Sequence, residues 1–101
     1  MGKKERTRGE IIQDLLLVTL EERQASKTKI MQRAYLNQKS FQKYFHFLLG
    51  NGYLTTCGLP VRKYMVTTKG REMLDWVRQV NQLLNQMICL EESQEDLSGI
   101  S

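Results

Sequence analysis

The sequence predicts a small, mainly helical domain with one β-hairpin, that is, a mainly α fold of the α+β type. Three observations predict this class. Apolar residues recur at intervals of three and four along most of the chain, which is the spacing of amphipathic helices. Two short segments rich in β-branched and aromatic residues flank a single turn. Proline, which interrupts helices, occurs once in the 101 residues, and it lies in that turn.

The first helix is expected over about residues 8–22, after a basic N-terminal arm at residues 1–7. Thr7 can cap it, because a threonine oxygen accepts a hydrogen bond from the free N–H groups of the first turn. The apolar face is formed by Ile11, Ile12, Leu15, Leu16, Val18 and Leu20.

Two further helices are expected around a tight turn at residues 35–37. Ser26 or Thr28 can cap the shorter one, and Asn37 is the predicted N-cap of the longer one, which ends at the glycines of residues 50–52. The longer helix has an apolar face made by Phe41, Tyr44, Phe45, Leu48 and Leu49. Its opposite side carries amides and basic groups, namely Gln38, Lys39, Gln42, Lys43 and His46.

Residues 53–56 and 63–67 are expected to pair as a hairpin around the turn at residues 58–60. Thr67 or Thr68 can then cap a last helix.

That last helix is expected over about residues 68–90, because no proline or glycine follows Gly70 in this range. At 1.5 Å per residue it would be roughly 33 Å long, about the width of the whole domain. Its second half therefore needs another partner. Residues 91–101 are acidic and lack aromatic residues, so they are expected to form a flexible tail.

Charge is divided unevenly along the chain, whose formal net charge is +4. From Arg23 to Arg71 there are ten basic residues and no Asp or Glu, whereas the segments on either side are net acidic. Basic side chains without neighbouring carboxylates face a polyanion or form a solvated basic surface. Nucleic acid is the partner that this block favours.

The order helix, helix, tight turn, helix, hairpin, long helix is that of a winged helix-turn-helix, whose third helix lies in the DNA major groove. Amides on that helix suit base edges, and lysines suit phosphates. Arg62 and Lys63 lie next to the hairpin tip, where a wing would reach the backbone or the minor groove. The plainer explanation of Gln38 and Gln42 is that glutamine is a good helix former on a hydrated face.

Five segments, at residues 29–37, 41–44, 47–49, 52–54 and 64–70, resemble small archaeal winged-helix DNA-binding proteins. That group includes chromatin-associated proteins and regulators encoded by archaeal viruses, and the resemblance covers about residues 8–90. It implies a homodimer formed through the C-terminal helix, with two recognition helices presented to successive major grooves. It assigns DNA contact to Gln38, Lys39, Ser40, Gln42 and Lys43, and to the wing around Arg62 and Lys63.

Combining both arguments, we expect a DNA-binding surface on the second and third helices and the wing. Its candidate residues are Lys29, Asn37, Gln38, Lys39, Ser40, Gln42, Lys43, His46, Arg62 and Lys63.

An apolar stripe on the last helix extends beyond anything that the first helix can cover, which is typical of an association site. Its candidate dimerisation residues are Val77, Val80, Asn81, Leu84, Met87 and Ile88, although Asn81 interrupts one possible seam. The alternative is that the stripe packs back on its own domain, with Trp76 and Leu83 filling gaps on the first helix.

The inventory of reactive groups excludes the common enzyme classes. The chain has one histidine, two cysteines 32 positions apart, and no acid between Glu22 and Glu72 to orient His46. Glycine-rich phosphate loops and paired metal-binding motifs are missing from the sequence. We therefore expect no enzyme activity, no cofactor, no metal site and no small-molecule substrate.

Cys57 and Cys89 are expected to be free thiols, as is usual inside cells. The alternative comes from the resemblance to archaeal proteins, since hyperthermophiles use intracellular disulfides. In that case Cys89 would pair with Cys89 of a second copy, and Cys57 with the neighbouring wing region.

The sequence thus predicts a dimeric protein that binds double-stranded DNA and regulates transcription. Its longest apolar run has four residues, so neither a membrane span nor a membrane partner is expected. Such a protein would be soluble and cytoplasmic, at the nucleoid, or in the host cytoplasm if viral. The alternatives are a sequence-tolerant architectural protein and a winged-helix module for protein contacts. RNA is less favoured, because no exposed aromatic platform for stacking bases is evident.

Overall fold

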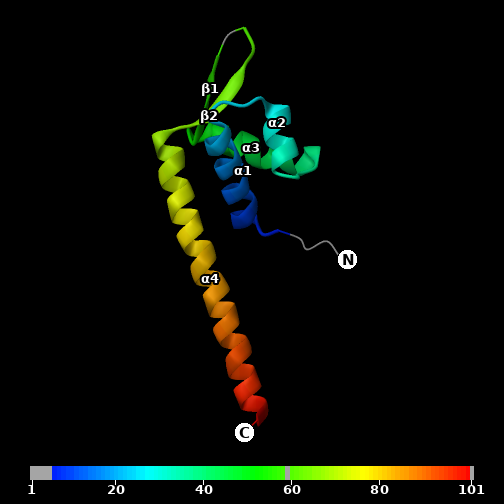
Figure 1. Ribbon diagram of the computed structural model, residues 1–101, viewed down its shortest axis with the longest axis vertical. Helices are drawn as coiled ribbons and strands as arrows, with labels where there is room; N and C mark the ends of the chain where they lie inside the picture. The colour runs from blue at the N-terminus through cyan, green and yellow to red at the C-terminus, as the bar shows by residue number, and fades with distance from the viewer. Residues whose placement is uncertain (1–5, 59, 101) are drawn as a thin grey trace.

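The computed structural model describes the backbone of residues 6–58 and 60–100 and the side chains as far as Met87, Leu59 excepted. Figure 1 shows a compact head from which one long helix projects. This architecture confirms the predicted class. In chain order the elements are α1 (Arg8–Glu22), α2 (Lys27–Arg33), α3 (Gln38–Gly50), β1 (Leu54–Cys57), β2 (Lys63–Val66) and α4 (Thr68–Ile100).

The first three helices begin at side-chain caps. The Thr7 hydroxyl accepts a hydrogen bond from the Glu10 N–H at 3.1 Å, and the Glu10 carboxylate accepts one from the Thr7 N–H at 2.9 Å. Ser26, rather than Thr28, caps α2, and Asn37 caps α3 through the Ser40 N–H at 2.8 Å. These short-range bonds fix where each helix begins, which is why their starts are predictable from sequence.

The core is centred on Phe45 of α3, whose side chain is fully buried. Its ring stacks on Phe41 with centroids 4.9 Å apart and meets the edge of Tyr64 from β2, also at 4.9 Å. These contacts lock one face of α3 to the sheet. The other fully buried residues are Leu15, Leu16, Thr19, Ile30, Leu48 and Leu54.

The hairpin pairs β1 with β2 in antiparallel register, from Leu54 opposite Val66 to Cys57 opposite Lys63. It differs from the predicted hairpin by one residue at the start and end of β1 and at the end of β2. The second strand ends before Thr67, because the Thr67 hydroxyl donates to the Gly52 carbonyl at 2.6 Å and accepts from the Gly70 N–H at 2.9 Å. Thr67 therefore ties the turn after α3 to the start of α4.

Gly70, in the first turn of α4, packs tightly against Tyr53 and Val66. A Cβ at this position would lie 2.1 Å from the Tyr53 carbonyl oxygen and 2.7 Å from Cγ1 of Val66. Since the backbone cannot yield as a flexible side chain does, we expect Gly70→Ala to lower the free energy of unfolding by about 3 kcal/mol or more. Thermal melting tests this, with Gly50→Ala as the control, because nothing lies within 4 Å of a Cβ there. Equal melting temperatures for the two variants would contradict the expectation.

The last helix is longer than predicted. It continues to Ile100, so the segment expected to be a flexible tail is helical at residues 91–100. Ser101 lies outside the described residues. The physical reason is that Glu, Gln and Leu dominate residues 91–97, and these are strong helix formers whatever their net charge. Across residues 6–58 and 60–100, none of the helices has the length and apolar character needed to cross a membrane.

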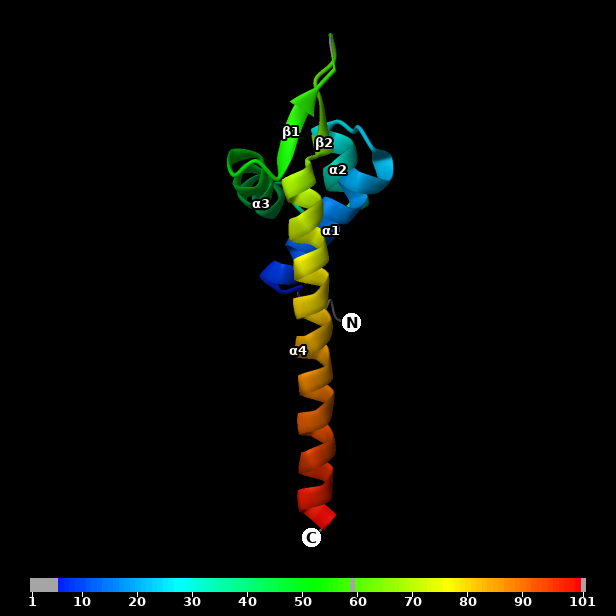
Figure 2. The ribbon, with the colours of Figure 1, turned by 90° about the vertical axis from the view of Figure 1, so that its left-hand side faces the viewer.

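The first half of α4 packs beside α1, as Figures 1 and 2 show from two sides. Leu74 and Val77 are buried in this part of the chain, and Nδ2 of Asn81 donates to the side-chain Oε1 of Gln13 at 2.6 Å. Val77 was predicted to face a partner subunit, and this is wrong, because its own domain already covers it. Beyond Asn85 the helix leaves the head.

Candidate nucleic-acid interface

One face of α3 carries the polar residues that the sequence singled out. Phe41, Phe45 and Leu48 anchor the helix from its inner side. The same helical periodicity therefore turns the remaining side chains outward. The five predicted residues Gln38, Lys39, Gln42, Lys43 and His46 are all exposed.

Two of the other candidate residues, Asn37 and Ser40, form the N-terminal cap of α3. The Asn37 side-chain oxygen is held by the Ser40 N–H, and the Ser40 side chain is half-buried. Asn37 is exposed, so its Nδ2 remains free to donate while its oxygen caps the helix. The cap thus orients the first turn of α3, where Gln38 and Lys39 lie.

The neighbouring helix α2 contributes a second group of exposed side chains. Lys29, a predicted DNA-contact residue, is exposed, and so are Lys27 and Thr28, which were not among the predicted DNA-contact residues. Lys27 places its Nζ 5.4 Å from the centre of the Phe45 ring. The Ser26 cap could have indicated these two residues, because it places Lys27 and Thr28 in the first turn of α2. In the structure both lie on the side of α2 that faces α3.

The wing projects from the head at the end away from the C-terminus (Figure 1). Arg62 and Lys63 are both exposed, and Val61 beside them is 62% exposed. The hairpin is joined to the head by the pairing of Ala25 with Tyr64, whose backbone groups exchange hydrogen bonds of 3.0 and 2.8 Å. The wing base is therefore attached to the segment between α1 and α2.

One basic residue of the carboxylate-free block has carboxylate partners in space. Arg33 forms ion pairs with Glu21 and Glu22 of α1, each at 3.0 Å. These hydrogen bonds raise the pKa of the Arg33 guanidinium above its ordinary value. The expectation that the whole block lacks carboxylate partners is therefore wrong for Arg33. Within residues 6–58 and 60–87, the other nine basic residues of the block form no ion pair.

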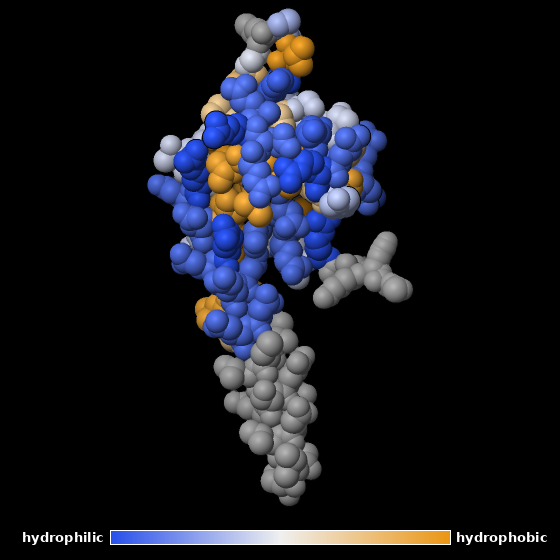
Figure 3. Space-filling model, viewed as in Figure 1, coloured by the Kyte–Doolittle hydropathy of each residue, from blue (hydrophilic) through white to orange (hydrophobic). Residues whose placement is uncertain are grey.

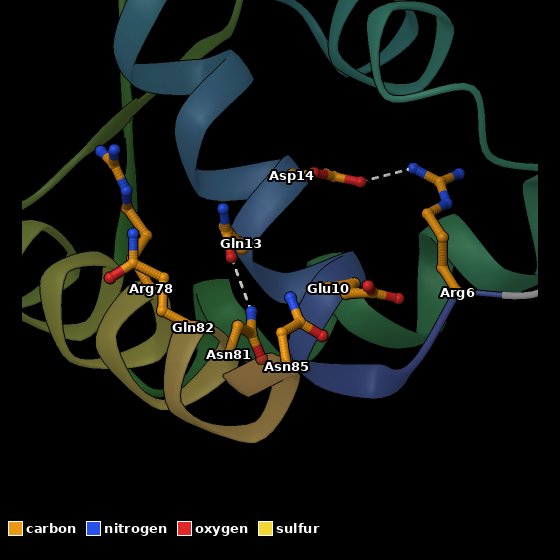
Figure 4. A pocket seen from close by; sticks show the side chains of 8 residues that line it. All are labelled: Arg6, Glu10, Gln13, Asp14, Arg78, Asn81, Gln82 and Asn85. Atoms are coloured by element: carbon orange, nitrogen blue, oxygen red, sulfur yellow. Dashed lines mark hydrogen bonds and ion pairs between the residues drawn. The ribbon is translucent and has the colours of Figure 1, made fainter. Parts of the chain in front are cut away.

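A polar groove separates α1 from the middle of α4, as Figure 4 shows. It has a volume of about 320 Å³ and mixes both charges with amides. The Arg6 guanidinium bonds to Asp14 at 2.6 Å and to the Tyr35 carbonyl at 2.8 Å, so this residue of the N-terminal arm is docked on the head. The groove explains the asparagine that interrupts the predicted seam, because Asn81 bonds across it to Gln13.

Four large apolar side chains on α4 are about half exposed or more in one chain. The exposed fractions are 62% for Trp76, 56% for Leu83, 49% for Leu84 and 48% for Met87. In Figure 3 an apolar patch lies on α4 next to the grey segment. Trp76 and Leu83 therefore do not fill gaps on α1, which was the alternative prediction.

These residues define an α4 stripe that consists of Trp76, Val80, Leu83, Leu84 and Met87. Four of them recur at intervals of four and three, the spacing of a helix-pairing seam. The side chain of Ile88, also predicted for dimerisation, lies outside the described residues.

Cys57 is a free thiol, half-buried at the end of β1 opposite Lys63. The side chain of Cys89 lies outside the described residues, so the predicted alternative of a bridge between two copies is not tested by the structure. Among the described residues no cluster of three metal-binding side chains occurs.

The arrangement of three helices, a hairpin wing and a further helix defines a winged helix-turn-helix protein. A family model described as winged helix-turn-helix matches residues 5–85, and the chain belongs to this family. The winged helix-turn-helix is a DNA-binding fold rather than an enzyme fold.

Solved structures give more particular relatives. Sso10a-2, a DNA-binding protein from Sulfolobus solfataricus, is 25% identical, with a TM-score of 0.81 over 91% of this chain and 96% of that one. The transcriptional regulator BldR from the same organism is 21% identical, with a TM-score of 0.63 over 89% of this chain and 70% of BldR. ZitR from Lactococcus lactis, solved in complex with DNA, is 16% identical, with a TM-score of 0.55 over 99% of this chain and 76% of ZitR. No curated protein sequence matches the chain significantly.

Proposed function

We propose that this chain is a homodimeric protein that binds double-stranded DNA and regulates transcription. The observation that carries the proposal is the exposed surface of α2 and α3, which presents amides and lysines and contains no Asp or Glu between Arg23 and Arg71. A helix with this surface, anchored on its inner side by three buried residues, is rigid and suited to a polyanionic groove.

The amides and the lysines of α3 have different roles in DNA binding. Gln38 and Gln42 each offer a donor and an acceptor, which match the N7 and N6 groups of adenine in the major groove. Lys39 and Lys43 neutralise phosphates on either side. Arg62 and Lys63 on the wing reach the backbone or the minor groove beyond the recognition helix. The description of Sso10a-2 as a DNA-binding protein and the DNA complex of ZitR support this use of the fold.

The dimer would form through the α4 stripe. A contact between two copies would bury Trp76, Leu83 and Met87, which otherwise expose apolar surface to water. A two-fold symmetric contact presents two copies of α3, so that the preferred DNA site would be a palindrome with half-sites about one helical turn apart.

A second candidate function is a sequence-tolerant architectural protein. The observation that favours it is the excess of basic groups over amides on the same surface, because phosphate contacts alone support binding without base readout. Sequence preference separates the two functions.

Replacing Gln38 or Gln42 with alanine tests base readout. Selection from a randomised duplex pool gives the preferred site, and each variant is then titrated against that site and an unrelated duplex. We expect about tenfold weaker binding to the preferred site, since one two-bonded amide contact discriminates by about 1–3 kcal/mol, and little change for the unrelated duplex. Equal losses on both duplexes would show that these amides do not read bases, and would favour the architectural function.

A further inference from the structure

A small cavity opens between α2 and α3, beside the amides that we assign to base contact. It has a volume of about 150 Å³. Its apolar part is formed by Met31 of α2 and by Phe41 and Phe45 of α3. Since Phe45 is fully buried and is held by Phe41 and Tyr64, each at 4.9 Å, this apolar wall is fixed before any ligand arrives.

The residues at the rim of the cavity are polar or basic, and none of them is acidic. Gln38, Gln42 and His46 follow one line along α3 at intervals of four residues, and Lys27 and Thr28 stand opposite on α2. The Lys27 ammonium lies 5.4 Å from the Phe45 ring centre, so a positive charge stands over the apolar part. An occupant that fits this chemistry has a small apolar tip, polar edges for the amides, and a negative charge close by.

Duplex DNA offers one group of that kind. The C5-methyl of thymine is the only apolar group on the base edges of the major groove. Its own base pair and the next present the acceptors and donors that a glutamine reads, and the phosphates lie along the edge of the groove.

We propose that the cavity between α2 and α3 receives the 5-methyl group of one thymine in each half-site. The protein would thereby select a T·A pair at a fixed position next to the pair read by Gln38 or Gln42. Lys27 would leave the face of Phe45 to bind the neighbouring phosphate. This inference rests on the proposed DNA-binding function and adds the identity of one base to it.

Deoxyuridine substitution tests the proposal without altering the protein, because it removes the methyl group and keeps the pairing with adenine. In the selected duplex, each thymine is replaced in turn and the affinity is measured by fluorescence anisotropy. One position in each half-site should bind about fourfold more weakly, the value for losing one buried methyl-sized group. Replacing both symmetry-related thymines should weaken binding by about fifteenfold, and other thymines should have little effect.

Met31→Gln supplies the matching change in the protein, because it places a polar group of similar length in the cavity. This variant should bind thymine and deoxyuridine duplexes equally well, whereas the control Gln32→Ala, on the exposed side of α2, should keep the fourfold difference. If Met31→Gln has a much lower melting temperature, the deoxyuridine series with the unchanged protein is sufficient to test the proposal.

The possible outcomes distinguish failure of the cavity's role from failure of the proposed DNA-binding function. Selective binding with no thymine sensitive to deoxyuridine would overturn the cavity's role and leave the DNA-binding function standing. A sensitive thymine whose effect persists in a folded Met31→Gln variant would likewise overturn the cavity's role alone. Absence of duplex binding at 50 mM salt would overturn both.

Discussion

Reversing two charges on α3 should nearly eliminate DNA binding. In the variant Lys39→Glu/Lys43→Glu, four phosphate contacts per dimer become repulsive, so the affinity should fall on the order of a hundredfold or more at 50 mM salt. The slope of log affinity against log salt should become shallower by about four, one for each lost contact. Anisotropy titrations over a salt series measure both quantities.

The control is Arg8→Glu, which reverses one charge in the first turn of α1 and therefore makes half the change in net charge. Arg8 is exposed, and an acidic residue there is favoured by the helix dipole, so the head should stay folded. A loss in log affinity for this control that is half that of the α3 variant or more would mean that net charge alone governs binding. The α3 surface would then have no special role.

Placing a charge in the α4 stripe should separate the dimer. Leu83 is 56% exposed in one chain, and Leu83→Glu would bury two carboxylates against each other in a symmetric contact. We expect the unchanged protein to scatter light with twice the 11.8 kDa chain mass and the variant to scatter with the mass of one chain. Trp76, the single tryptophan, should report the same change, with redder fluorescence in the variant.

Loss of the dimer should also weaken DNA binding, because two linked recognition helices gain about 10²–10⁴ in affinity from binding together. Gln82→Glu is the control, since it adds the same charge to an exposed position on another side of α4. A single-chain mass for the unchanged protein, or a dimer that survives Leu83→Glu, would refute the proposed interface.

The parts of the fold that could be predicted from sequence are those set by interactions between residues close together in the chain. Thr7, Ser26 and Asn37 each accept a hydrogen bond from an N–H three residues further on. The start of each of these helices is therefore determined by a few neighbouring residues. The exposed face of α3 follows equally directly from the period of its apolar residues.

The features that sequence could not supply depend on contacts between distant segments. Arg33 meets Glu21 and Glu22 only because α2 packs on α1. On α4, two apolar stripes overlap at spacings of three and four, and the sequence does not say which one faces α1. The packing of α4 on α1, which includes the hydrogen bond from Asn81 to Gln13, leaves Val77 buried and Trp76 62% exposed.

The central claim is that the exposed surface of α2 and α3 binds DNA with sequence preference. Fluorescence anisotropy of the protein against its selected duplex and a randomised one, at 50 and 200 mM salt, tests this most directly. A dimer that contacts roughly 6–10 phosphates should lose on the order of 10³–10⁵ in affinity between the two salt concentrations while still preferring the selected duplex. Failure to bind either duplex at 50 mM salt would contradict the claim and would direct attention to the α4 stripe as a protein-docking surface.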